Sequence, residues 1–215
     1  ACKHGVIRRI THENLEWCSP SFVVTRNRQS KDLKNQQQDQ SLPFSKRYRV
    51  VIDYTRLNKA TVDCPTVLPR LDDELVRLQG YKYFSTIDLK SFYHSIPLTP
   101  EASLKCAFSV GAETFAPNYV FEGLKRAVDI STRIGRDLQK NIETDIIAWI
   151  DDSAIPAHEK DQMRKYIRQY FINARELGVM INISKSVFCS KKITFLGFVI
   201  EADEKGVVSY VPLSQ

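Results

Sequence analysis

Apolar residues along the chain recur with two different spacings, and each spacing predicts one kind of element. Residues three or four positions apart form helical stripes over 71–78, 127–138 and 163–177, and Gly178 is a suitable stop for the last helix. Shorter runs rich in β-branched and aromatic residues predict strands: SFVVT, RYRVVID, YFSTID, KCAFSV, TFAPNYVF, DIIAWID, SVFCS and ITFLGFVI. We expect the last two runs to close as a hairpin. The mixture predicts an α+β fold whose sheet carries helices on one face.

The segment from about 26 to 46 interrupts this pattern, because it is polar, rich in glutamine and has almost no apolar anchor. It predicts a long, flexible loop, and the strands on either side of it are expected to form a projecting hairpin. Residues 1–59 hold twelve lysines and arginines against five acids, while the whole chain has a net charge of +6. This local excess favours a surface that faces phosphate groups, and a solvated face without a partner is the alternative.

Composition narrows the class of protein further. Of the 215 residues, 43% are hydrophobic, which is enough for a substantial core. No apolar run reaches the roughly 18 residues of a membrane span, and the N-terminal sequence lacks the apolar stretch of a signal peptide. The five cysteines are scattered, without the spacing of a zinc site or a disulfide framework. We therefore expect an intracellular protein with reduced thiols, in a cytosolic or nuclear setting. A fragment of a longer protein is also expected, because the chain starts at Ala1 and its motifs run to the end.

Carboxylates at the ends of predicted strands are the main chemical signal. Asp88 ends YFSTID, and Asp151 and Asp152 follow the apolar run IIAWI. A buried strand gains no stability by ending on an ionised group, because such a group resists desolvation unless it is paired or bound to metal. If the two strands are neighbours, three carboxylates meet at one edge of the sheet, where oxygen ligands suit Mg²⁺ or Mn²⁺. The alternatives are a turn or cap role for Asp88 and a solvated turn for the Asp-Asp pair.

The order of these segments resembles the fingers and palm of reverse transcriptases, especially those of gypsy-class LTR retrotransposons and retroviruses. The resemblance is carried by RVVIDYTRLNKAT, YFSTIDLKSFYHSIPL, WIDD and LGVMINISKSVFCSKKITFLGFVI, and it covers nearly the whole chain. It implies a polymerase right hand with an antiparallel palm sheet backed by helices. Residues 1–82 would be mainly fingers and 83–215 mainly palm, with part of 105–125 returning to the fingers. The thumb and RNase H domains would be absent.

The same resemblance implies an RNA-directed DNA polymerase. The reaction would be the two-metal addition of a dNTP to a primer 3′-OH on an RNA or DNA template, with two Mg²⁺ (or Mn²⁺) ions as cofactors. The partners would be the primer–template, the dNTP and the thumb and RNase H regions of a parent polyprotein. No membrane is implied, and a homodimer is a further arrangement to consider.

Roles for single residues follow from the matching positions. Asp88 would be the first catalytic aspartate, and Asp151 and Asp152 the pair of the family's Tyr-x-Asp-Asp signature. These carboxylates and the backbone carbonyl of Leu89 would hold the metal, and Lys185 would protonate the departing pyrophosphate. The other implied residues are Arg49, Tyr93, Glu122 and Gly123 at the nucleotide, and Phe195, Leu196 and Gly197 in the primer-gripping hairpin. Plain structural roles are the alternative: core for Tyr93, and solvated surface for Arg49 and Lys185.

The segment VFEGLKRAVDIST departs from the family pattern, since Glu122 stands where Phe or Gln is usual and Val128 where Pro is usual. A carboxylate at that place would repel a triphosphate unless it pairs, for example with Lys125 or Arg126. Trp149 stands where Tyr is common. Two hypotheses therefore stay open: a working but divergent polymerase, or a domesticated, catalytically weak or inactive fold that binds nucleic acid or protein. A metal-dependent nuclease that uses the same acids is a third.

Overall fold

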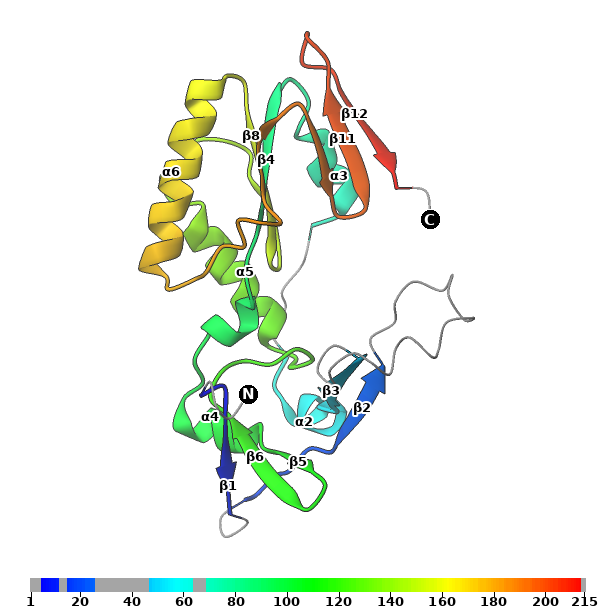
Figure 1. The fold of residues 1–215 in the computed structure, drawn as a ribbon, viewed down its shortest axis with the longest axis vertical. Helices are drawn as coiled ribbons and strands as arrows, with labels where there is room; N and C mark the ends of the chain where they lie inside the picture. Colours follow the sequence, from blue (N-terminus) through cyan, green and yellow to red (C-terminus); the bar gives the residue numbers. More distant parts are fainter. Residues whose placement is uncertain (1–4, 12–14, 26–46, 64–68, 214–215) are drawn as a thin grey trace. The chain divides into compact units, whose positions relative to one another are not determined.

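In the computed structural model, the described residues are 5–11, 15–25, 47–63 and 69–213. The segment 26–46, predicted as a flexible loop, lies outside them. Within these residues helices and antiparallel strands are mixed, which confirms the α+β class (Figure 1). No helix in this part of the chain has both the length and the apolar character needed to cross a bilayer.

Two compact units make up the chain. The first consists of residues 1–62 and 96–125, and the second of residues 63–95 and 126–215. The division after Val62 differs from the boundary predicted after residue 82. The reason is that Leu75 and Leu78, which follow that division, are buried in the core of the second unit.

The first unit is built from two small antiparallel sheets and short helices. Its elements are β1 (Ile7–Ile10), β2 (Ser21–Thr25), β3 (Tyr48–Ile52), α2 (Thr55–Ala60), α4 (Pro100–Lys105), β5 (Phe108–Val110) and β6 (Glu113–Pro117). One sheet has the order β1-β6-β5, and β2 pairs with β3 in the other. The β2–β3 register runs from Ser21 opposite Ile52 to Thr25 opposite Tyr48, so these strands pair as predicted.

The second unit contains the longer elements. They are α3 (Leu71–Val76), β4 (Tyr83–Asp88), the 3₁₀ turn η3 (Phe92–Ser95), α5 (Ala127–Leu138), β7 (Ile147–Trp149), β8 (Asp152–Ala157), α6 (Lys160–Glu176), β9 (Val187–Ser190), β10 (Lys192–Phe195), β11 (Phe198–Ala202) and β12 (Val208–Pro212). A four-stranded antiparallel sheet has the order β7-β8-β4-β9, and β10-β11-β12 form a separate antiparallel sheet. The helix α6 ends as predicted, because Gly178 adopts a left-handed conformation with φ +68°.

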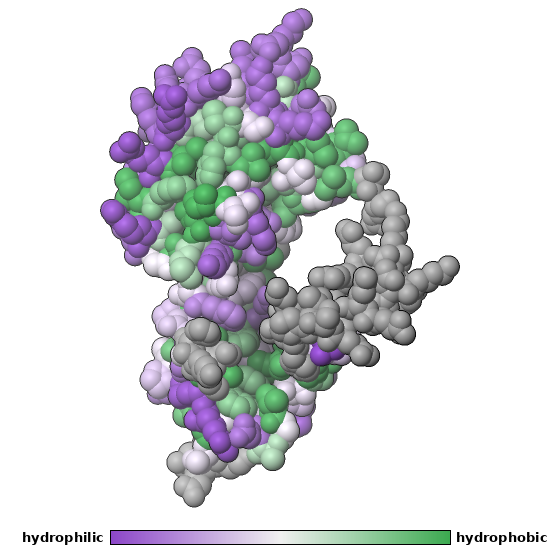
Figure 2. All heavy atoms as spheres, viewed as in Figure 1, coloured by the Kyte–Doolittle hydropathy of each residue, from purple (hydrophilic) through white to green (hydrophobic). Residues whose placement is uncertain are grey.

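The two faces of the four-stranded sheet are covered differently. On one face, Ser85 donates a hydrogen bond to Met163 of α6 (3.0 Å), and Ser153 shares one with Tyr170 of the same helix (2.9 Å). On the other face, Phe84 and the residues aligned with it pack into a core made with α3 and the β10–β12 sheet. Figure 1 shows α5 and α6 on one side of β4 and β8, and α3 with β11 and β12 on the other. In Figure 2, hydrophobic colour covers the middle of this unit between hydrophilic margins.

One predicted strand pairing, the hairpin of SVFCS with ITFLGFVI, is corrected by the structure. SVFCS forms β9 and pairs with β4 rather than with ITFLGFVI, and ITFLGFVI is itself a complete hairpin of β10 and β11. The prediction also missed β8, the sequence DSAIPA. All its residues after Asp152 are buried, so it has no alternation of polar and apolar residues, and its small side chains give no strong β signal.

The carboxylate of Asp145 ties the loop before β7 to the chain after α3. Arg77 donates a hydrogen bond to it at 2.8 Å and the Tyr81 hydroxyl donates another at 2.9 Å, and both lower its pKa. A carboxylate whose folded pKa is lowered stabilises the protein above its unfolded pKa, and the stabilisation disappears as the pH falls through the folded value. We expect Asp145→Asn to lower the free energy of unfolding at pH 7 by about 0.5 kcal/mol, since half-exposed ion pairs contribute little.

Urea unfolding of Asp145→Asn and the unsubstituted chain at several pH values measures this effect, and the difference should close in acid. Asp161→Asn is the matched control, because Asp161 and its partner Arg164 are both about four-fifths exposed. A difference that is the same at neutral and acid pH would contradict the ionic origin of the effect.

Candidate active site

The three predicted aspartates meet at one end of the four-stranded sheet. Asp88 is the last residue of β4 and Asp152 the first of β8, and the register pairs them directly across the two strands. Asp151 lies in the turn between β7 and β8. The two strands predicted to end on acids are therefore not neighbours, because β8 lies between β7 and β4. The carboxylates come together all the same, since β8 begins with one of them.

The turn that holds Asp151 is short and conformationally unusual. Trp149 pairs with Asp152, which leaves Ile150 and Asp151 as a two-residue loop. Ile150 has φ +57°, and two-residue hairpin loops need such a positive φ to match the twist of their strands. For a β-branched residue this conformation is strained and persists only where the surroundings impose it. One such constraint is the Leu89 N–H, which donates to the Asp151 carbonyl at 2.9 Å.

Electrostatics around Asp152 reflect the crowding of negative charge. Burial raises the pKa of this carboxyl, and the charges of Asp151 and Asp88 raise it further. Lys185 acts in the opposite direction, and its Nζ lies 3.7 Å from Oδ2 of Asp88. Lys185 is 69% exposed, so its ammonium group only partly offsets the three carboxylates.

The donor set at this sheet end is chemically suited to a hard divalent cation. It consists of carboxylate oxygens and the backbone carbonyl oxygen of the buried Leu89. A bound cation would relieve the repulsion that raises the pKa of Asp152. Over the described ranges, however, no three metal-ligating side chains are gathered as closely as a formed metal site requires. The donor types fit a cation, whereas the side-chain arrangement is not that of a closed site.

A serine and an asparagine that the sequence analysis did not single out hold Asp88 in place. The Asp88 N–H donates to Ser186 Oγ (3.2 Å), and the Asp88 carbonyl accepts from the Asn182 N–H (2.8 Å). The available signal was the cluster of Asn and Ser around Lys185 in NISKS, since such side chains organise turns by binding nearby backbone groups.

The hairpin predicted to grip the primer is a two-residue turn between β10 and β11. Phe195 pairs with Phe198, and the loop residues Leu196 and Gly197 have φ +48° and +82°. Phe195 is buried in the core of the second unit, with 3% of its surface exposed. Of the three predicted residues, only Leu196 and Gly197 lie at the tip of the turn.

Comparison with known proteins identifies the family. Residues 33–200 match the family described as "Reverse transcriptase (RNA-dependent DNA polymerase)". The chain belongs to this reverse transcriptase family. It is 32% identical over 163 residues to the retrovirus-related Pol polyprotein from transposon opus of Drosophila melanogaster, covering 74% of this chain and 16% of that polyprotein. It is 29% identical over 169 residues to the enzymatic polyprotein of Cestrum yellow leaf curling virus, covering 78% of this chain and 26% of that one.

Solved reverse transcriptases share the fold. The foamy viral protease-reverse transcriptase in complex with RNA/DNA hybrid superimposes with a TM-score of 0.74 at 24% identity, over 93% of this chain and 24% of that one. The same viral protein in complex with dsDNA gives a TM-score of 0.75 over 93% of this chain and 38% of the other. The predicted architecture of fingers and palm is thereby confirmed. This reverse transcriptase chain spans only about a sixth to a quarter of the polyproteins named above.

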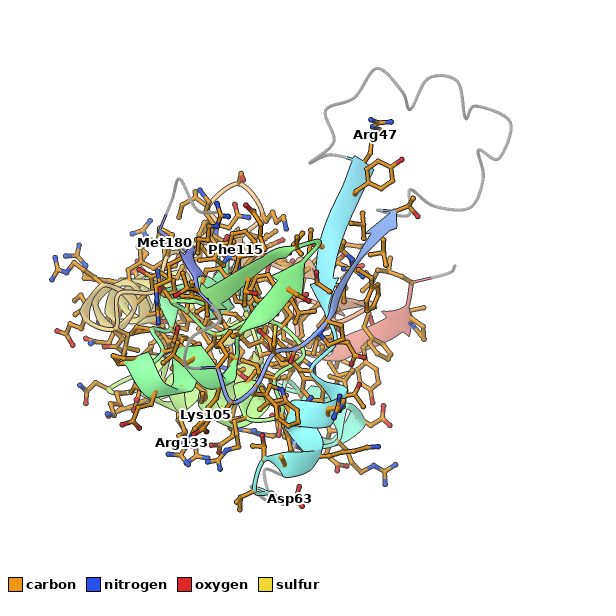
Figure 3. All side chains as sticks on the ribbon, turned by 90° about the horizontal axis from the view of Figure 1, so that it is seen from below. Arg47, Asp63, Lys105, Phe115, Arg133 and Met180 are labelled. Atoms are coloured by element: carbon orange, nitrogen blue, oxygen red, sulfur yellow. The ribbon has the colours of Figure 1, made fainter. Side chains whose placement is uncertain are left out.

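The residues predicted at the nucleotide are divided between the two units. Arg49 is an exposed residue of β3 in the first unit. Just before this strand, Arg47 places its guanidinium over the ring of Tyr48, 5.2 Å from the ring centre (Figure 3). Glu122 and Gly123 also belong to the first unit, whereas Tyr93 lies in η3 of the second. Tyr93 is therefore the only one of these four predicted residues that lies in the same unit as the aspartates.

The loop with Glu122 does not neutralise its carboxylate. Lys125 directs its Nζ to the backbone carbonyls of Asn58 (3.4 Å) and Thr61 (3.1 Å), and Arg126 pairs with Asp129 at the start of α5. No ion pair of Glu122 occurs among the residues with described positions. Gly123 has φ +89°, and its carbonyl accepts from the Asn58 side chain at 2.7 Å. The helix α5 begins at Ala127 although Val128 replaces the usual proline.

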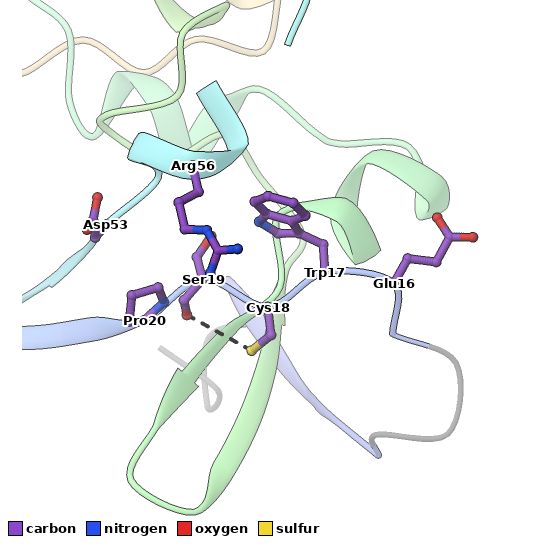
Figure 4. A pocket seen from close by; sticks show the side chains of 7 residues that line it. All are labelled: Glu16, Trp17, Cys18, Ser19, Pro20, Asp53 and Arg56. Atoms are coloured by element: carbon purple, nitrogen blue, oxygen red, sulfur yellow. Dashed lines mark hydrogen bonds between the residues drawn. The ribbon is translucent and has the colours of Figure 1, made fainter. Parts of the chain in front are cut away.

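A cavity of about 260 Å³ in the first unit is separate from these residues. It is lined by Glu16, Trp17, Cys18, Ser19, Pro20, Asp53 and Arg56, with the Arg56 guanidinium over the Trp17 ring at 5.5 Å (Figure 4). Trp17 Nε1 and Ser19 Oγ are buried without a hydrogen-bond partner in the described part of the chain. Because both atoms are closed off from solvent, a molecule in the cavity would not reach them. None of the predicted site residues lines this cavity.

Proposed function

We propose that this chain is the fingers and palm of an RNA-directed DNA polymerase from a gypsy-class LTR retrotransposon, acting inside the cell. The observation that carries the proposal is the direct pairing of Asp88 with Asp152 across β4 and β8, with Asp151 in the adjoining turn. In the reaction, the 3′-oxygen of a primer attacks the α-phosphorus of a dNTP. A new P–O bond forms, the bond to the β-phosphate breaks, and pyrophosphate leaves.

The carboxylates of Asp88, Asp151 and Asp152 and the Leu89 carbonyl would hold two Mg²⁺ or Mn²⁺ ions, in line with the divalent ions that the family generally uses. Such ions, when bound, neutralise charge on the attacking and leaving oxygens. The crowding that raises the pKa of Asp152 supports this assignment, because it leaves a concentration of negative charge for a cation to offset.

Other residues would bind and orient the substrates. Lys185, next to Asp88, would donate the proton that the departing pyrophosphate takes up. Arg49, exposed on β3, would bind phosphate oxygens through its planar guanidinium, and Tyr93 would exclude a 2′-hydroxyl by its bulk. Leu196 and Gly197 would contact the primer backbone. The first unit would be the fingers and the second the palm, and a thumb and an RNase H region elsewhere in a parent polyprotein would complete the grip on the duplex.

Nucleic acid would be the main partner, with the dNTP as substrate. The foamy viral proteins of the same fold are described in complex with dsDNA and with RNA/DNA hybrid. The positive excess in residues 1–59 of this chain suits the phosphate backbone of such a duplex.

The test is the addition of a single nucleotide to a labelled DNA primer, on RNA and on DNA templates, with Mg²⁺ or Mn²⁺ and high dNTP. Extension that follows the template base is expected on both. Binding of primer–template that is indifferent to divalent ions and dNTP, without extension, would reject polymerase activity for this chain. Cleavage of the template in place of extension would identify a nuclease.

A second function is favoured by the carboxylate of Glu122, which makes no ion pair with any residue that the structure describes. A negative charge beneath the incoming triphosphate opposes its binding, and neither Lys125 nor Arg126 neutralises it. In this second proposal the chain is a reverse-transcriptase fold with weak or no catalysis that serves as a binding module for nucleic acid or protein.

The substitution Glu122→Gln separates the two proposals. For a divergent polymerase we expect the KM for dNTP to fall by about threefold to tenfold while kcat changes little, because one charge repulsion is removed from substrate binding. Glu101→Gln, at an exposed acid of α4 in the same unit, is the control. Steady-state kinetics of single-nucleotide addition provide the measurement, and an unchanged KM would mean that Glu122 does not face the triphosphate.

A further inference from the structure

The backbone N–H and C=O groups of Asp88 point away from β8. The Leu89 N–H donates to the Asp151 carbonyl, so the pair Asp88–Asp152 occupies a position of the antiparallel ladder where the two residues exchange no hydrogen bonds. The N–H and C=O of Asp88 therefore point to the other side of β4. Their partners on that side decide how the carboxylate is held.

One short loop supplies both partners. Ser186 Oγ accepts from the Asp88 N–H at 3.2 Å, and the Asn182 N–H donates to the Asp88 carbonyl at 2.8 Å. The loop is closed on itself by the same hydroxyl, since Ser186 Oγ donates to the Asn182 carbonyl at 2.9 Å. Ser186 thus joins the strand end of Asp88 to both ends of the loop 182–186.

Lys185 is carried by this loop. Its N–H donates to the Asn182 carbonyl at 3.1 Å, and its Nζ lies 3.7 Å from the Asp88 carboxylate. The side chain is long and 69% exposed, so packing does not fix the ammonium group. The loop sets where the Lys185 backbone lies relative to Asp88. Ser186 adds a side-chain bond between loop and strand end, beside the backbone bond from the Asn182 N–H and the pairing of Val187 with Thr86.

We propose that Ser186 is a positioning residue for nucleotide addition. Its hydroxyl ties the backbone of Asp88 to the loop that carries Lys185, so that the backbones from which the carboxylate and the lysine side chain extend keep one relative position at the end of β4. The proposal rests on the proposed polymerase function. A small displacement of groups that act on the reacting atoms lowers the rate of the chemical step more than it lowers substrate binding.

Kinetics of Ser186→Ala test this role. We expect kcat for single-nucleotide addition to fall by about tenfold, with the KM for dNTP within about twofold of the unsubstituted value. Ser186→Thr keeps a hydroxyl and should recover most of the rate. The matched control is Ser184→Ala: Ser184 is exposed in the same loop and bonds only the Asn182 side chain (2.8 Å), so the rate should stay the same.

Hydrogen exchange of the Asp88 amide gives a readout that does not depend on activity. Loss of the acceptor should speed this exchange several-fold in Ser186→Ala and leave it unchanged in Ser184→Ala. We call the two hydrogen bonds of the Ser186 hydroxyl, to the Asp88 N–H and to the Asn182 carbonyl, the clamp. Unchanged exchange of the Asp88 amide would show that the clamp does not form, and faster exchange with an unchanged kcat would show that it has no role in catalysis. If the unsubstituted chain adds no nucleotide, the polymerase function and the positioning role fail together, while the exchange rates still show whether the clamp exists.

Discussion

Asp151→Asn is expected to lower the rate of nucleotide addition by roughly a hundredfold to a thousandfold while the fold stays intact. The substitution removes one of three negative charges at the end of the sheet without changing the size of the side chain. Preorganised charge at the reacting atoms is commonly the largest single contribution to catalysis, and the loss of one such group costs about 10²–10³ in kcat. The backbone of the turn is unaffected, because the Asp151 carbonyl still accepts from the Leu89 N–H. Primer extension measures the rate, and circular dichroism checks the fold.

The same variant should respond differently to divalent ions. Without them, Asp151→Asn is expected to be at least as stable as the unsubstituted chain, because the charge of Asp151 opposes that of Asp152. Added Mg²⁺ or Mn²⁺ should raise the Tm of the unsubstituted chain more than that of the variant, since ligands that bind only the folded state stabilise it. Asp161→Asn, the exposed surface variant, should follow the unsubstituted chain in both assays. Full activity of Asp151→Asn would refute the catalytic assignment of the turn.

The largest loss of stability is expected from Gly206→Ala, in the turn between β11 and β12. Gly206 has φ +83°, and a Cβ atom there would lie 2.8 Å from the carbonyl oxygen of Gly80 and 3.1 Å from its carbonyl carbon. These are backbone atoms, held close because the Gly80 N–H donates to the Gly206 carbonyl at 2.9 Å. The left-handed conformation and the steric overlap together should lower the free energy of unfolding by about 3 kcal/mol. For a chain of this length that corresponds to roughly 6–12 °C in Tm.

Gly178→Ala separates the two causes of that loss. Gly178 also has a positive φ, +68°, but no atom lies within 4 Å of the position its Cβ would take. This variant should lose only about 1 kcal/mol, the conformational part alone. Urea denaturation of both variants measures the difference, and equal losses would mean that the close approach of Gly206 to Gly80 can relax at little cost.

The sequence was sufficient for elements with a strong pattern and insufficient for pairings that depend on tertiary contacts. The helices α5 and α6 have long amphipathic stripes, and β4 and β7 have apolar runs that end on acids, so each was predicted close to its observed position. The strand β8 was missed because burial on both faces removes the alternation by which strands are recognised. The partner of β9 could not be predicted, since nothing in SVFCS distinguishes an edge of the β4 sheet from a hairpin with the following strand.

The candidate site shows the same limit. The aspartates were found from their residue type and place after apolar runs, but their meeting depends on a register that only the folded sheet defines. Ser186 went unnoticed because a hydroxyl acquires its role from the backbone group it happens to face, here the Asp88 N–H. Phe195 was assigned to the primer-gripping hairpin by its resemblance to the family, whereas the alternation of side chains along β10 places it in the core. The predicted roles of Arg49, Tyr93 and Lys185 remain predictions.

The two-residue turn between Trp149 and Asp152 makes this region intolerant of length variation, whatever its residues. Side chains alternate between the two faces of β8, so an insertion or deletion of one residue in the turn would exchange the faces along the whole strand. Ser153 would then leave Tyr170 of α6, and the carboxylate of residue 152 would turn from Asp88 towards the helices. A substitution at a position other than the aspartates, such as Trp149, leaves this alternation of faces unchanged. Variation in this segment should therefore occur as substitutions at constant length outside Asp151 and Asp152, and a one-residue insertion or deletion in the turn should mark a copy that has lost the site.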